Sequence, residues 1–146
     1  SPSQTRAWLR RYPVGMTTPM MSDITTEGIR VGARAYYVPE ESDTDNHEYY
    51  FGYRILILNS SDQTVKLISR HWDIIDAEGR RNVVEGPGVV GEQPLLQPNR
   101  AFKYTSFCKL PTHWGTMEGR YQMRRNDGSK FEVAIARFWL TLQNTS

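Results

Sequence analysis

The chain has 146 residues, a length typical of one domain that buries a core without disulfides or metals. Hydrophobic residues make up 38% of it and aromatic residues 12%, which favours a β-rich globular domain over disorder. The net charge of +2 excludes a strongly basic nucleic-acid-binding chain. Cys108 is the only cysteine, so no intrachain disulfide forms, and a reducing compartment is favoured. The longest apolar run, residues 55–58, is too short to span a membrane, and we expect no membrane partner.

Residues 1–23 are interpreted as a basic N-terminal tail or linker, because their only acidic residue is the last, Asp23. The arginines of this tail are Arg6, Arg10 and Arg11. A composition rich in Arg and Ser and poor in acids resembles the end of a mitochondrial transit segment. We therefore expect a mitochondrial location, with a cytoplasmic or nuclear one as the alternative. Trp8, Arg10 and Arg11 are candidate partner contacts, and the arginines also allow contact with RNA.

Strand-like patterns fill residues 24–146, the predicted globular domain. Alternating apolar and polar residues predict a half-buried strand over residues 29–37. Residues 49–58 carry apolar side chains on both faces, which predicts a central strand. Further strands are predicted over residues 65–75, 80–85, 101–107, 117–124 and 131–142. Seven or eight short strands without a helical period predict an all-β sandwich.

A glycine-rich stretch over residues 84–94 places Gly86, Gly88 and Gly91 in the spacing G-x-G-x-x-G. This spacing binds a dinucleotide pyrophosphate when it joins a strand to a helix. No helix pattern follows here, so the helix N-terminus that attracts the anion is missing. A structural bend is the favoured interpretation, and an anion site formed by bare backbone N–H groups is the alternative. The arginines that are candidates to lie beside such a site are Arg70, Arg80 and Arg81.

Catalytic and metal-binding residue types form no recognisable constellation. His71 lies on a predicted strand without a nucleophile or second ligand at a known spacing, which favours a structural histidine. An EF-hand loop beginning at Asp43 would need glycine where Glu48 stands. Cys108 and His113 fall short of the four ligands of a zinc site. We therefore predict a non-enzymatic chain with no cofactor and no metal.

Aromatic and arginine residues interleave in the second half of the chain. Such residues are typical of protein-interface hot spots and of platforms for single-stranded bases. Trp114, in an irregular stretch, is predicted to be the exposed tryptophan, while the core takes most of the others. Trp114 and His71 are therefore candidate partner contacts.

Four motifs stand in order along the chain: SRHW at residues 69–72, VEGPGVVGEQP at 84–94, YTS at 104–106 and GTMEG at 115–119. On these motifs, residues 28–140 resemble the ApaG domain family. Two residues depart from the family pattern: Ala136 stands where proline is usual, and Phe107 stands where glycine is frequent. The first departure leaves the bend of the last strand open.

The resemblance implies an immunoglobulin-like or fibronectin type III-like β-sandwich, no established catalysis and a role in protein interaction. It also implies that Gly86, Gly88 and Gly91 correspond to a motif suggested to bind pyrophosphate. We predict a binding module with a protein partner, as a subunit of a larger assembly; a homodimer is a further alternative. The rival functions are a phosphate or nucleotide binder, using the glycines and Arg70, and an RNA-contacting component of a mitochondrial ribonucleoprotein.

Overall fold

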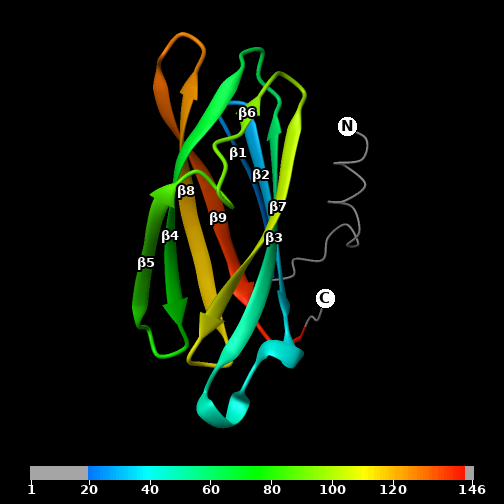
Figure 1. The fold of residues 1–146 in the computed structure, drawn as a ribbon, viewed down its shortest axis with the longest axis vertical. Helices are drawn as coiled ribbons and strands as arrows, with labels where there is room; N and C mark the ends of the chain where they lie inside the picture. Colours follow the sequence, from blue (N-terminus) through cyan, green and yellow to red (C-terminus); the bar gives the residue numbers. More distant parts are fainter. Residues whose placement is uncertain (1–19, 144–146) are drawn as a thin grey trace.

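The computed structural model describes residues 20–143 and shows two antiparallel sheets facing each other (Figure 1). The first sheet has the order β1 (Met21–Thr26), β2 (Ile29–Tyr37), β3 (Tyr49–Asn59), β7 (Ala101–Leu110). The second has the order β5 (Arg81–Pro87), β4 (Val65–Asp76), β8 (Gly115–Arg125), β9 (Lys130–Leu140), and the two-residue β6 (Leu95–Leu96) also pairs with β4. Two short 3-10 helices, Pro39–Glu41 and Thr44–Asn46, lie between β2 and β3. The predicted all-β sandwich is confirmed, with β1 and β6 added to the predicted strands.

The core lies between the two sheets and is rich in aromatic side chains. Phe51 of β3 and Tyr121 of β8 are fully buried, and Trp72 of β4 is 2% exposed. The Trp72 ring packs edge-on against Tyr53 and Phe138, with ring centroids 5.4 and 5.9 Å apart. Such tilted aromatic contacts add to the stabilisation that burial provides.

Strand β2 was predicted to be half-buried, and this prediction is wrong, because β2 is covered on both faces. Tyr36 lies flat over Gly52 of the neighbouring strand, where a Cβ would be only 2.2 Å from the tyrosine ring. The guanidinium of Arg54 then covers the Tyr36 ring at 4.6 Å from its centroid. The outer face of β2 is thus shielded by long side chains rather than by another layer of structure.

One side of the sandwich is closed by contacts between β1 and β9. The Ser22 hydroxyl donates to the Ala136 carbonyl at 2.7 Å, and the Ala134 N–H donates to the Thr26 hydroxyl at 3.2 Å. Near Ala136 the register of β9 with β8 shifts, so the last strand bends there without a proline. On the opposite side lie β7 and β5, and within residues 20–143 each pairs with a single neighbouring strand. The sandwich is therefore open between two free strand edges.

A β-bulge in β4 decides which side chains face this opening. The register with β8 shifts between Leu67 and Ser69, so Ile68 is an extra residue. A bulge exchanges the faces to which the following side chains point. Arg70 therefore lies on the inner side of the sheet, and His71 lies on its outer face.

None of the helices described in residues 20–143 is long and apolar enough to cross a membrane.

Candidate functional site

The glycine-rich stretch forms a tight hairpin turn that folds back onto β4. The Val89 N–H donates to the Glu92 carbonyl at 2.8 Å, and the Glu92 N–H donates to the Val89 carbonyl at 2.9 Å. The two central residues, Val90 and Gly91, have φ of +43° and +79°. Positive φ at both central positions is the mark of a type I′ turn. The predicted bend is present, and the turn leads to β6 rather than to a helix.

Gly88 is required for a structural reason. A Cβ at this position would lie 2.0 Å from the Glu92 carbonyl oxygen, and the residue has a φ of +59°. Its N–H donates to the carbonyl of Ile68, the extra residue of the β4 bulge, at 2.8 Å. The Gln93 side chain donates to the same carbonyl at 2.9 Å. Bulge and glycine turn thus hold each other in place.

Arg70 is the arginine that lies at the glycine turn. Its Nη1 donates to the carbonyls of Pro87 and Gly88, at 3.0 and 3.1 Å. The guanidinium lies against Gly86, where a Cβ would be 3.0 Å from both terminal nitrogens. Among residues 20–143, no acceptor takes a hydrogen bond from Arg70 Nε or Nη2. Arg70 therefore fixes the turn with one nitrogen and keeps further donors for a ligand.

The other two candidate arginines are engaged elsewhere. Arg80 donates to the buried carboxylate of Asp76 at 2.8 Å, and Arg81 donates to Asp73. Two backbone N–H groups also donate to Asp76. Burial alone would raise the pKa of Asp76, but the hydrogen bonds from Arg80 and Glu78 outweigh it and hold this pKa below its ordinary 3.8.

A cavity of about 180 Å³ opens beside the glycine turn. It is lined by Tyr53, Arg70, Trp72, Val89, Val90, Gly91, Tyr104 and Ser106. Gly91 has no side chain, so the turn contributes main chain here. One cation and several hydroxyl groups line the cavity, and no carboxylate does, which suits an anionic group. We call this cavity the glycine end.

The glycine end continues into two further cavities along the open side of the sandwich. A cavity of about 350 Å³ shares Tyr53, Arg70, Trp72 and Ser106 with it. A third, of about 260 Å³, shares Ile74, Asn82 and Lys109 with the second. Together the three form one channel between β7 and β5, which we call the edge groove. Its far end, lined by Arg80, Arg81 and Lys109, is called the basic end.

The hydroxyls near Arg70 belong to buried tyrosines. The Tyr104 and Tyr121 oxygens lie 2.5 Å apart and form a hydrogen bond between the two sheets. Burial raises the pKa of both phenols well above the ordinary value of 10.0, although the hydrogen bond from Tyr121 lowers that of Tyr104. Burial also raises the pKa of Tyr53, and its hydrogen bond with Ser106 opposes this. All three hydroxyls therefore stay protonated and able to donate at neutral pH.

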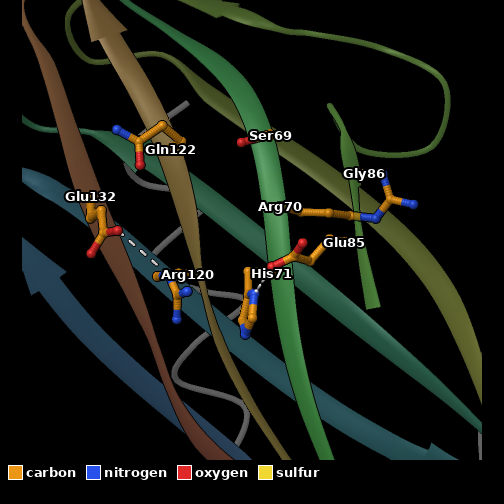
Figure 2. Close-up of a pocket in the computed structure, with 8 residues that line it drawn as sticks. All are labelled: Ser69, Arg70, His71, Glu85, Gly86, Arg120, Gln122 and Glu132. Carbon is orange, nitrogen blue, oxygen red and sulfur yellow. Dashed lines mark hydrogen bonds and ion pairs between the residues drawn. The ribbon is translucent and has the colours of Figure 1, made fainter. Parts of the chain in front are cut away.

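His71 lies in a separate hollow of about 300 Å³ on the outer face of the second sheet (Figure 2). Its ring nitrogens lie 2.6 Å from Glu85 Oε1 and 3.2 Å from Asp73 Oδ2. Arg120, which points toward His71 in Figure 2, pairs with Glu132 at 3.5 Å. The same view shows Arg70 extending beneath Gly86, away from these residues. The charged side chains of His71, Glu85, Arg120 and Glu132 in this hollow are thus paired with carboxylates or cations, and a partner contact through His71 stays a prediction.

The remaining predicted contacts fall in two places. Trp114 was predicted to be exposed, but it is partly buried because its ring stacks on Trp139 at a centroid distance of 5.2 Å. Trp139 is the more exposed partner, at 38%. Trp8, Arg10 and Arg11 lie outside the described residues, as does Arg6. A partner contact through any of them stays a prediction.

The sequence interpretation missed the residues of β7 that complete the groove. Tyr104, Ser106 and Cys108 share the inner face of this strand, and Ser106 and Cys108 line the groove beside Trp72. Their period of two was a usable signal, but it does not say that β7 is an edge strand.

Within residues 20–143 no group of three or more His, Cys, Asp or Glu residues is placed to hold a metal ion.

Comparisons with known proteins place this geometry in a family. The ApaG domain matches residues 39–125. Protein ApaG of Brucella anthropi is 50% identical over 117 residues, covering 80% of this chain and 90% of that protein. Protein ApaG of Rhodopseudomonas palustris is 49% identical over 115 residues, covering 79% and 88%. A crystal structure named as an ApaA protein of Bordetella pertussis is 44% identical, with a TM-score of 0.77, and the match covers 87% of this chain and 100% of that one. The chain therefore belongs to the ApaG domain family.

Proposed function

We propose that the chain is a non-enzymatic protein-binding module that holds an extended segment of a partner protein in the edge groove. The observation that carries this proposal is the position of the groove between two free strand edges, β7 and β5. An extended segment gains main-chain hydrogen bonds from an edge strand, and pockets for alternate side chains supply specificity.

The lining of the groove indicates the chemistry of the occupant. The middle is formed by aromatic and apolar side chains, with Tyr53, Trp72 and Met117 at its floor. Val84 of β5, which is partly buried, lines the middle as well. Arg70 at the glycine end has no carboxylate partner among residues 20–143, whereas Arg80 and Arg81 at the basic end pair with carboxylates, so the segment that fits is apolar in the middle and acidic at the glycine end. The stretch of β7 along the groove, residues 104–110, matches an extended segment of roughly seven residues.

A phosphate-bearing ligand is the second candidate, and the glycine end favours it. Arg70 and the tyrosine and serine hydroxyls there suit a phosphoryl group as well as a carboxylate. The mitochondrial location and the RNA contact depend on residues outside the described part of the chain, and they stay predictions. The phosphate candidate is tested against the peptide below.

The test uses the full chain and a synthetic pool of random peptides of about seven residues. Peptides retained by the protein are identified by mass spectrometry, and their affinities are measured by fluorescence anisotropy. Val84→Ala is expected to weaken binding by roughly fivefold, since it removes an apolar contact in the middle of the groove. Val83→Ala is the matched control, because Val83 is 42% exposed and lies outside the groove lining.

Hydrogen exchange of the protein with and without a selected peptide locates the bound segment. The free-edge amides of β7 or β5 are expected to become protected when the peptide binds. Retention of no peptide, or equal binding by Val84→Ala and wild type without protection at either edge, contradicts the proposed function.

A further inference from the structure

The glycine end differs from the rest of the groove in its hydrogen-bonding character. The N–H groups of Val90 and Gly91 find no acceptor among residues 20–143. In a type I′ turn these two amides are not needed for the turn itself. Arg70 keeps Nε and Nη2 unused, and the Ser106 hydroxyl lies in the same cavity. Main-chain and side-chain donors therefore converge where the groove ends.

The direction of the strands decides which end of a bound segment reaches this cavity. Strand β7 runs from Tyr104 at the glycine end to Leu110 at the basic end. A segment added antiparallel to the free edge of β7 brings its carboxyl end to the glycine end, whereas one added antiparallel to β5, which ends there at Pro87, brings its amino end. The donors and the cation at the glycine end favour the carboxyl end and thus pairing with β7. Antiparallel pairs are slightly more stable per residue than parallel pairs and outnumber them about two- to threefold.

The groove is also obstructed beyond the glycine end. The turn at residues 89–92 crosses from β5 back to β4, and its main chain forms one wall of the cavity. Val89 itself is fully buried beneath it. A segment that enters from the basic end thus meets the main chain of the turn, which carries two N–H groups without an acceptor among residues 20–143, rather than an open exit. A chain that stops there fits better than one that continues.

We propose that the edge groove recognises the free carboxyl terminus of its partner, with the terminal carboxylate bound by Arg70, the Ser106 hydroxyl and the N–H groups of Val90 and Gly91. This inference rests on the proposed function, because it specifies which part of the partner binds in the groove. Carboxyl termini are recognised elsewhere by backbone N–H groups in this manner. A guanidinium adds a charge-assisted, fork-shaped contact to the carboxylate.

The experiment compares matched forms of the tightest peptide selected above. One form ends in a free carboxylate, the second in a carboxamide, and the third in an aspartate carboxamide, whose carboxylate is a side chain. The free acid is expected to bind at least about tenfold more tightly than both other forms. In wild-type protein, the Val90 and Gly91 amide resonances should shift with the free acid and stay in place with the carboxamide.

Two variants test the side-chain donors. Ser106→Ala removes a hydroxyl that also bonds to Tyr53 and leaves the turn contacts of Arg70 intact, so it should weaken binding of the acid by a few-fold relative to the carboxamide. Arg70→Gln should abolish the preference for the acid. Because Arg70 also holds the turn, the Arg70→Gln result is used only if a melting curve shows that the variant is folded. If the variant is unfolded, the Val90 and Gly91 amide shifts of wild-type protein provide the test.

The outcomes separate the inference from the proposed function. Equal binding of the acid and the carboxamide overturns the inference but does not contradict the proposed peptide-binding function. Equal binding of the aspartate carboxamide overturns it too, because the groove then reads an acidic side chain. Retention of no peptide refutes the proposed function and the inference together. Pyrophosphate that shifts the Val90 and Gly91 amides and displaces the acid at lower concentration assigns the glycine end to phosphate, which also overturns the inference.

Discussion

Replacement of Val90 by asparagine is expected to stabilise the protein. Val90 is a β-branched residue with a φ of +43°, a conformation that costs about 1–3 kcal/mol for side chains of this kind. Asparagine tolerates this region and is the preferred residue before glycine in a type I′ turn. The Val90 side chain is 52% exposed, so the substitution gives up roughly half of a valine's burial, about 0.7 kcal/mol. The net gain is about 1 kcal/mol.

Urea denaturation measures this gain directly, through a higher midpoint at an unchanged dependence on urea concentration. A gain of about 1 kcal/mol also corresponds to an increase of roughly 3 °C in Tm for a domain of this size. Two controls flank the variant. Val83→Asn makes the same substitution at a valine of β5 that is 42% exposed and has a negative φ, and it should not stabilise the protein.

Gly91→Ala is the second control, and it should destabilise the protein by roughly 1 kcal/mol. A Cβ at Gly91 would meet nothing within 4 Å, so the loss reports only its φ of +79°. Opposite signs at neighbouring positions of one turn would be difficult to explain by contacts. A Val90→Asn protein no more stable than wild type, with the urea dependence unchanged, refutes the assignment of strain to Val90.

Three further predictions concern the titratable groups. Burial raises the pKa of Tyr104 and Tyr121 in the folded protein, while the unfolded chain releases these protons near pH 10.0. The free energy of unfolding should therefore fall as pH rises above that value. A near-ultraviolet titration should show both tyrosines ionising only when the protein unfolds. Burial raises the pKa of the Cys108 thiol to about 12, so its alkylation should be slow at neutral pH, accelerate about tenfold per pH unit up to pH 11, and slow further when a peptide fills the groove. The pKa of Asp76 lies below 3.8 in the folded protein, so the ionised carboxylate stabilises the fold above that pH, and this stabilisation is lost as pH falls. Asp76→Asn should therefore lower the free energy of unfolding at pH 7 and have less effect at pH 3, as measured by chemical denaturation.

The strands were predictable because alternation is a local property of the sequence. The period-two pattern marks a strand wherever one face meets a core, whatever the order of strands in the sheet. The covering of both faces of β2 was not predictable in this way. It depends on Tyr36 covering Gly52 and on Arg54 covering Tyr36, and these contacts exist only once β2 and β3 are paired in register.

The bulge at Ile68 shows why the site was only partly predictable. The sequence places Arg70 and His71 next to each other near the glycine stretch, and both were candidates. A single extra residue decides which of them faces the groove, and nothing in the local pattern announces it. The glycine spacing did indicate a bend, but Val90 carries no local signal of its positive φ. The groove itself forms because β7 and β5 are the edge strands of the two sheets on the same side of the sandwich. That position follows from the strand order and not from any local sequence pattern.

The turn variants also test how the glycine end recognises its ligand. Val90→Asn keeps the positive φ at both central positions, so the two free N–H groups stay in place while the apolar side chain is lost. The preference for a free carboxylate should therefore survive in this more stable protein. Gly91→Ala strains the same backbone and should reduce the preference along with the stability. If Val90→Asn loses the preference while its turn stays formed, the ligand reads the valine side chain and not the turn amides. Stability and recognition would then be coupled through a hydrophobic contact rather than through backbone geometry.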